Sequence, residues 1–320
     1  MFFTLERINK IASQLNSYVY LDRTRVNDYL MKEGNFKEVV DVDKDESSWQ
    51  KFTTGEKWGG RDLHAWFRTT VKVPQQFDGK MVALYVSTGA TGWDATNPQF
   101  ILFVNGQMVQ GLGVNHREVI LSRKAKAGDE YQIDLHAYSG MDDKKADLLV
   151  QLVALDEKIR NIYYNIKVPA IVASGMDKDN KTTIDILKVL NETINILDLR
   201  KPYSKAFYDS IDEADAFLQR EFYEKMCNYD DVIATCVGHT HIDVAWLWTV
   251  AQTREKAARS FATVLNLMDE YPEYMFMSSQ PQLYKFVKED HPELYERIKQ
   301  KIGEGRWEAD GAMWVEADCN

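Results

Sequence analysis

The segment VGHTHIDVAW, residues Val237–Trp246, decides how the C-terminal part of the chain is interpreted. It follows an apolar run rich in β-branched residues, Val232 to Val237, which is typical of a buried parallel strand. His239, His241 and Asp243 then alternate with other residues, so they share one side of an extended segment. Imidazole nitrogens and carboxylate oxygens are common ligands of Zn²⁺. The segment therefore predicts a metal site where a strand ends.

The residues after this segment predict an α/β arrangement. A helical stripe runs from Ala257 to Met268, and short strands are expected at Tyr274–Met277 and Arg306–Gly311. Between these strands, Pro281 and Pro292 stand where helices begin, because proline is favoured in the first turn. The order β-α-β-α-β predicts the start of a parallel α/β domain over residues 231–320.

Polar side chains follow all three expected strands. Ser278, Ser279 and Gln280 follow the second strand, and residues 311–318 follow the third. In open parallel sheets, ligands bind beyond the carboxyl ends of the strands. We therefore expect these groups to converge with His241 and Asp243.

Each candidate residue also has a structural interpretation. Asp243 is a favoured N-cap type, so it could cap a helix that starts near Val244. Core packing is the alternative for the indoles and is expected for Trp248 and Trp307, whereas Trp246 and Trp314 flank the predicted site. Structural roles are favoured for the carboxylates Glu308, Asp310 and Glu316.

The upstream residues indicate three further parts. We expect an N-terminal helical segment at 1–40, a β-sandwich at 41–158 and a helical connector at 159–230. The sandwich rests on short β runs separated by turn residues, with Asn105-Gly106 as a hairpin turn between two of them. The connector rests on two amphipathic stripes. The chain is thus expected to be a multidomain α and β protein.

Composition excludes several classes of partner. The 320 residues carry a net charge of −10, which argues against nucleic acid and against an anionic membrane surface, because both attract basic proteins. No apolar run approaches the roughly 20 residues of a membrane helix, and no secretory signal is expected at the start. The 3 cysteines do not suggest a disulfide framework. These features predict a cytoplasmic location, and they are compatible with a homo-oligomer.

Three motifs carry a specific resemblance. GHTHIDVAWLW, SSQPQLYKF and EGRWEADGAMWVEADCN, in this order, resemble the start of the catalytic domain of glycoside hydrolase family 38, the α-mannosidases. Upstream, WGGRDLHAWF and FVNG resemble the galactose-binding-like domain that precedes this catalytic domain in the cytosolic and bacterial branch. The resemblance implies a zinc-dependent, retaining enzyme that hydrolyses terminal α-mannosides through a covalent mannosyl-enzyme.

The resemblance also assigns roles to residues. It implies that His241, Asp243 and Asp318 bind one Zn²⁺ and that Asp318 is also the nucleophile. It places Trp246 under the mannose, with His239 lining the site. Ala317 stands where the family usually has proline.

The family's remaining zinc histidine and its acid/base carboxylate come later in the chain than Asn320. We therefore expect residues 1–320 to be the N-terminal portion of a larger enzyme. We expect this portion alone to bind zinc weakly and to turn over no sugar.

Two other functions remain open from the sequence. One is a different metal-dependent hydrolase that uses the HxHxD site, although Val244 stands where a dinuclear H-x-H-x-D-H site needs histidine. The other is a carbohydrate-binding or assembly fragment, in which the sandwich binds sugar through Trp58 or Trp93.

Overall fold

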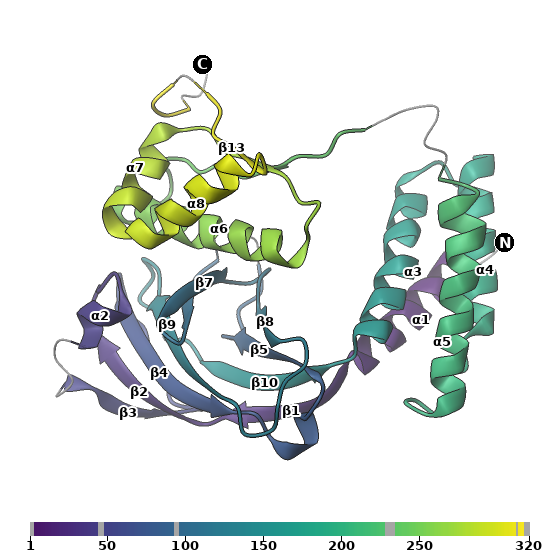
Figure 1. The fold of residues 1–320 in the computed structure, drawn as a ribbon, viewed down its shortest axis with the longest axis horizontal. Coiled ribbons are helices and arrows are strands. Elements are labelled where there is room, and N and C mark those ends of the chain that lie inside the picture. The colour runs from purple at the N-terminus through teal and green to yellow at the C-terminus, as the bar shows by residue number, and fades with distance from the viewer. Residues whose placement is uncertain (1–2, 44–47, 93–95, 228–233, 312, 317–320) are drawn as a thin grey trace.

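The computed structural model describes residues 3–43, 48–92, 96–227, 234–311 and 313–316. Figure 1 shows an antiparallel β-sandwich, a group of helices on one side of it, and a small part of helices and short strands that covers one of its sheets. Within the described residues, no helix is long and apolar enough to cross a membrane.

The β-sandwich consists of two antiparallel sheets, with strand orders β3-β2-β4-β9-β6-β7 and β1-β10-β5-β8. The turn at Asn105-Gly106 joins β6 to β7 with φ of 51° and 82°, the pair of positive angles that a tight two-residue hairpin turn requires. The predicted short strands and this hairpin are confirmed. The strands are β1 Tyr20–Val26, β2 Asp28–Glu33, β3 Gln50–Thr53, β4 His64–Lys72, β5 Met81–Ser87, β6 Gln99–Val104, β7 Gln107–Leu112, β8 Glu118–Ser122, β9 Glu130–Tyr138 and β10 Leu149–Leu155, with short helical turns α2 Val39–Val42 and η2 Gln75–Phe77.

Strands β4 and β6 are buried on both faces. Phe67 and Leu102 lie in the core between the two sheets. Their neighbours Trp66 and Phe103 lie in a different core, which includes helix α6 (Val250–Glu270). Successive side chains of a strand point to opposite faces, so these strands hold the sandwich together on one face and bind α6 on the other.

Trp58 is part of the sandwich core. Its side chain is only 2% exposed, and its ring centroid lies 5.2 Å from that of Phe67 and 5.9 Å from that of Phe100. The indole face is therefore covered by other rings and is not available to a sugar. This finding contradicts the idea that the sandwich binds carbohydrate through Trp58, and Trp93 lies outside the described residues.

The helical layer packs on the smaller sheet. Its core combines apolar residues of the helices with Met81, Ala83, Val153 and Leu155 from the outer face of β5 and β10. The side chains of Asp156, Asn180 and Ser204 accept hydrogen bonds from backbone N–H groups in the first turns of three of these helices, as N-caps do. The helices are α1 Thr4–Tyr18, α3 Glu157–Gly175, α4 Lys181–Ile196, α5 Lys205–Leu218 and the π-helical turn η3 Gln219–Glu224.

The prediction that residues 1–40 are helical is wrong beyond Tyr18. Residues 20–33 form β1 and β2, which pair with β10 and with β4. Tyr20, Thr24, Val26 and Tyr29 are aromatic or β-branched residues that fit a pleated sheet, and pairing with strands distant in sequence outweighs the weak helical spacing of this segment.

The third part carries a parallel sheet of three very short strands, in the order β11-β12-β13. The first strand was predicted at Val232–Val237, but residues 234–237 form no strand and 232–233 lie outside the described residues. Pairing begins only at Gly238, opposite Phe276 of β12. Pro281 and Pro292 begin helices as predicted. The elements are β11 Gly238–His239, α6, β12 Phe276–Met277, α7 Pro281–Asp290, α8 Pro292–Gly303 and β13 Trp307–Glu308.

Candidate functional site at the strand ends

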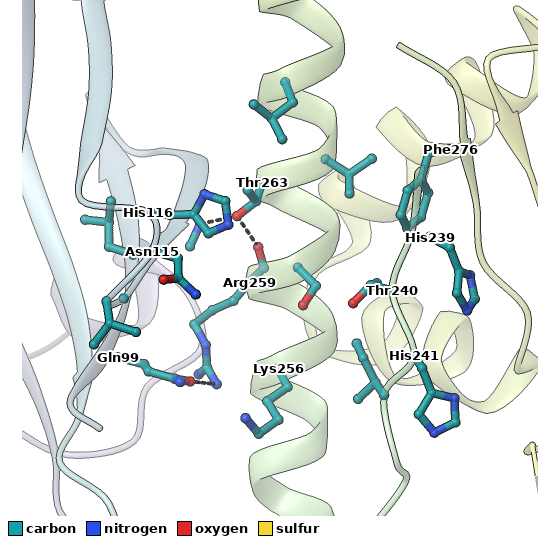
Figure 2. A pocket seen from close by; sticks show the side chains of 18 of the residues that line it. Gln99, Asn115, His116, His239, Thr240, His241, Lys256, Arg259, Thr263 and Phe276 are labelled. Carbon is teal, nitrogen blue, oxygen red and sulfur yellow. Dashed lines mark hydrogen bonds between the residues drawn. The ribbon is translucent and has the colours of Figure 1, made fainter. Parts of the chain in front are cut away.

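The HTHID segment, residues 239–243, leaves β11 in an extended conformation with alternating side chains. Figure 2 shows the rings of His239 and His241 on the side of the backbone that faces away from α6, whereas Thr240 points toward that helix. On its own side, His239 places Nδ1 3.1 Å from the backbone oxygen of Met277 on the neighbouring strand. As expected from the sequence, successive side chains point to opposite sides of the segment, and both histidines lie on the same side.

His241 lies between two carboxylates. Its Nε2 is 3.0 Å from Asp243 Oδ1, and its Nδ1 is 2.6 Å from Glu316 Oε2. The pKa of the His241 imidazole lies above its ordinary value. The hydrogen bond with Asp243 raises this pKa most, desolvation lowers it, and the hydrogen bond with Glu316 raises it further. Carboxylates only accept hydrogen bonds, so both ring nitrogens are held as donors when no other cation is present.

Glu316 is fixed by residues that follow β12. Ser279 Oγ donates a hydrogen bond to Glu316 Oε1, and Gln280 Nε2 lies 3.5 Å from Oε2. Gln280 also donates to the backbone oxygen of Ile242 at 3.0 Å and is only 2% exposed. Polar groups that follow the first and second strands, and a carboxylate that follows the third, are thus brought together.

The sequence analysis favoured a structural role for Glu316 and did not predict its contact with His241. The available signal was position, because Glu316 follows the third strand just as His241 follows the first.

Asp243 does not cap a helix. Helix α6 begins at Val250, and its N-cap is Thr249, whose side chain accepts from the Gln252 N–H at 3.3 Å. The alternative in which Asp243 caps a helix starting near Val244 is therefore wrong. Its carboxylate is instead directed at His241.

Trp307 packs in the core as predicted, but Trp248, for which core packing was also expected, is only half-buried. Trp307 is buried at 1% exposed, while Trp246 and Trp314 are 56% and 55% exposed. Trp246 meets Trp248 edge to face, with ring centroids 5.4 Å apart. Trp248 is half-buried, and the Lys256 ammonium lies 4.4 Å from its ring centroid. Trp246 therefore presents an open aromatic surface next to Asp243.

A cavity of about 570 Å³ lies between the sandwich and the HTHID segment. Figure 2 shows His116 and Asn115 on the sandwich side, with Lys256 and Arg259 on α6. Asp243 and Trp246 also line it. The sandwich thus contributes one wall of the space beside the candidate site.

The donor chemistry of the His241–Asp243 pair fits a metal ion. Metal-binding histidines usually donate their second ring N–H to a carboxylate or carbonyl oxygen, which fixes the ring. Glu316 stands in that position at Nδ1, which leaves Nε2 beside Asp243, where a divalent cation would replace a proton. In the part of the chain that the structure describes, no group of three or more His, Cys, Asp or Glu side chains is arranged to hold a metal. Asp318, the third expected ligand and expected nucleophile, lies outside the described residues.

Two stretches of the chain match known families. Residues 231–320 match the glycosyl hydrolases family 38 N-terminal domain, and residues 29–145 match the jelly roll domain of alpha-mannosidase. The first stretch contains the HTHID segment, and the second contains most of the sandwich. The resemblance to glycoside hydrolase family 38 indicated by the three motifs is confirmed.

The chain is also similar to individual proteins. It is 29% identical over 286 residues to "Alpha-mannosidase G" of Dictyostelium discoideum, covering 83% of this chain and 25% of the relative. It is 27% identical over 285 residues to "Alpha-mannosidase 2C1" of Homo sapiens, covering 83% and 26%. A solved β-glucuronidase of Ruminococcus gnavus aligns with a TM-score of 0.32 and 11% identity, over 42% of this chain and 29% of that one. The chain spans about a quarter of the length of the curated relatives it matches.

Proposed function

We propose that this chain is the N-terminal portion of a zinc-dependent, retaining α-mannosidase, and that the HTHID segment supplies part of its active site. The observation that carries the proposal is His241 held between Asp243 and Glu316 at the ends of three parallel strands. It lies inside the stretch that matches the family 38 domain. Neither the dinuclear hydrolase nor the sugar-binding sandwich is favoured by any comparable observation.

His241, Asp243 and Asp318 would hold the metal, with the remaining ligand supplied by the longer protein. When bound, Zn²⁺ supplies a Lewis acid that orients sugar hydroxyls and stabilises negative charge. Glu316 fixes the His241 ring through Nδ1, so that Nε2 is presented in one orientation. Gln280 fixes the backbone between the two ligands by binding the carbonyl of Ile242.

The covalent chemistry is assigned to Asp318. In a retaining glycosidase, a carboxylate attacks the anomeric carbon while the leaving group is protonated, and water then cleaves the glycosyl-enzyme ester. Trp246 would hold the mannose by stacking, since the exposed face of an indole packs well on sugar C–H groups. The acid/base carboxylate is expected in the longer protein, so we expect the 320 residues alone to be inactive.

The proposal also covers the sandwich, the short strands, the substrate and the location. The sandwich is a galactose-binding-like domain that serves as a scaffold, and the three short strands begin a larger parallel sheet. The substrate is a terminal α-mannoside, and the location is cytoplasmic.

The direct test is hydrolysis of an aryl α-mannoside by the gene product read to its natural stop codon. We expect release of the aryl group, its loss in the presence of a zinc chelator, and its return with added Zn²⁺. Aryl β-mannoside and aryl α-glucoside serve as matched control substrates and should remain uncleaved. Proton NMR of the first product should show α-mannose, since retention preserves the anomeric configuration. Activity that survives chelation would contradict the proposal.

A further inference from the structure

The segment WGGRDLHAWF, Trp58–Phe67, has no role in the proposed reaction, yet it contacts the part of the chain that carries the site. Its last residues begin strand β4, whose outer face packs against α6. His64 and Asp62 take part in two hydrogen-bonded links, each of which ends on the first two turns of that helix. The segment therefore connects the sandwich with the helix that follows the HTHID segment.

The first link is a buried contact between an imidazole and a carboxylate. His64 Nε2 lies 2.6 Å from Glu255 Oε1, and the Glu255 side chain is 4% exposed. Glu255 Oε2 lies 3.7 Å from Arg259, whose Nη2 donates to Gln99 of strand β6 at 2.6 Å. Removing one partner of a buried pair leaves the other charge uncompensated, so this network fixes α6 against two strands of the sandwich.

The second link runs through a tyrosine. Tyr138, at the end of β9, donates its hydroxyl proton to Asp62 Oδ1 at 3.0 Å and accepts a hydrogen bond from Gln252 Nε2. Gln252 is in the first turn of α6 and is only 6% exposed. The start of the helix is thus attached to the sandwich on both sides of one residue, Thr253.

Thr253 continues the connection into the candidate site. Its side chain is fully buried, and its hydroxyl lies 2.6 Å from the backbone oxygen of Val244. A hydroxyl has one proton, and we assign it to this nearest acceptor. The same oxygen accepts from the Trp248 indole N–H at 3.1 Å. Thr253 therefore holds both ends of the stretch from Val244 to Trp248, which carries Trp246 and directly follows Asp243.

We propose that Thr253 is a positioning residue for the HTHID site, and that the sandwich fixes the helical turn carrying it through His64–Glu255 and Tyr138–Gln252. For its effect on catalysis, this inference rests on the proposed function. The contacts by which Thr253 positions the segment do not depend on that function. The WGGRDLHAWF segment then has a structural role: it supports the helix that positions the site, and it is not a sugar-binding surface.

The test compares three variants of the gene product read to its natural stop codon. Thr253→Val keeps the shape of the side chain but removes its donor and acceptor, whereas Thr253→Ser keeps the hydroxyl. Thr263→Val is the matched control. It also removes a buried hydroxyl from α6, but Thr263 accepts from the Gly111 N–H of the sandwich at 3.1 Å and donates to Arg259 O at 2.8 Å.

Hydrogen exchange measured by mass spectrometry on peptides covering residues 240–249 gives a readout that does not need activity. We expect exchange there to be about tenfold faster in Thr253→Val, which corresponds to about 1.4 kcal/mol for a lost buried hydrogen bond. Thr253→Ser and Thr263→Val should match the wild type in these peptides. Equal acceleration in Thr253→Val and Thr263→Val would overturn the proposal, because a merely structural hydroxyl predicts that result.

Kinetics on the aryl α-mannoside add a second readout. We expect kcat to fall about tenfold in Thr253→Val and to be restored in Thr253→Ser, with Thr263→Val unchanged. A wild-type protein with no mannoside hydrolysis would refute the proposed function and leave the exchange result as the test of positioning. If Thr253→Val does not fold, Tyr138→Phe tests the sandwich side. It should speed exchange at 240–249, and unchanged exchange would overturn the role of the sandwich.

Discussion

The sandwich and the site-bearing part are held in place by different means. In the sandwich, β4 is paired with β9 along its whole length of 9 residues, so the backbone ladder sets the geometry. In the site-bearing part, each of β11, β12 and β13 has only 2 residues. There, the geometry depends on side-chain hydrogen bonds from Gln280, Thr253 and Ser279. The site is thus shaped by polar side-chain contacts, whereas the sandwich is shaped by the pairing of its own strands.

Burial follows the same division. The sandwich core includes Phe67 and Leu102 at 1% and 0% exposed, whereas the proposed ligand His241 has a side chain that is 44% exposed. Substitutions should therefore separate cleanly. Changes in the core of the sandwich should cost stability, and changes at the strand ends should cost activity.

The largest effect is expected for Asp243→Asn. A neutral amide is a poor replacement for a carboxylate that binds a cation, so we expect kcat for the aryl α-mannoside to fall at least about 10⁴-fold, or about 5 kcal/mol. The melting temperature should change by less than about 2 °C, because Asp243 is partly exposed. Asp310→Asn, the same change at an exposed residue after β13, is the control and should stay within about twofold. Similar losses in both variants would refute the assignment of Asp243.

The complementary effect is expected for Phe67→Ala in the sandwich. Phe67 contacts Phe52 and Trp58 in the core, so its truncation leaves a cavity and should lower the free energy of unfolding by about 3–5 kcal/mol. Urea denaturation followed by circular dichroism measures this. Phe3→Ala, at a side chain 75% exposed, should change it by less than about 0.5 kcal/mol. A small effect for Phe67→Ala would mean that the sandwich core is not the stable scaffold.

An intermediate effect is expected at the interface between the two regions and depends on pH. Burial raises the pKa of Glu255, but the hydrogen bond and charge of His64, with Arg259 and His136, lower it to about 2 from 4.5. A carboxyl with a lower pKa in the folded state stabilises the fold above its unfolded pKa, and this contribution is lost as pH falls toward the folded value. The contribution is about 3 kcal/mol near neutral pH.

The measurement is the free energy of unfolding of the wild type and of Glu255→Gln at pH 6 and pH 3. The stability advantage of the wild type should shrink by about 2 kcal/mol between these values, because the amide that replaces the carboxyl in the variant does not titrate. A constant difference between the two proteins would show that Glu255 is not held as a buried carboxylate.

The smallest effect is expected for Trp246→Ala. Loss of a stacking surface should raise KM for the aryl α-mannoside about tenfold, which is about 1.4 kcal/mol. The side chain is largely exposed, so the free energy of unfolding should change by less than about 0.5 kcal/mol. Trp246→Phe retains a ring and should recover most of the affinity. An unchanged KM in Trp246→Ala would remove Trp246 from the sugar-binding surface.

Features encoded locally were predictable from the sequence. Asn105-Gly106 forms its hairpin turn because these two residues tolerate positive φ. Pro281 and Pro292 begin helices because proline suits the first turn. The start of α6 was also encoded locally, since Thr249 and Gln252 have the spacing of a capping box, but Asp243 was weighed as the cap instead.

Features that depend on distant residues were not predictable. Tyr20 pairs with Leu155, and no local pattern in residues 20–33 reveals that partner. Glu316 contacts His241 and also accepts from Ser279 and Gln280, and those contacts join three separate strand ends. The roles of His239, His241, Asp243, Trp246 and Asp318 in catalysis stay predictions.

The central claim is that the His241–Asp243 pair holds the single zinc ion on which α-mannoside cleavage depends. The most direct test is to strip the metal from the gene product read to its natural stop codon and to titrate Zn²⁺ back while measuring aryl α-mannoside hydrolysis. We expect no activity in the metal-free protein and a rise that ends at one zinc per chain, with no recovery in His241→Ala. A metal-free protein that is fully active, or a titration that ends at two zinc ions per chain, would contradict the claim.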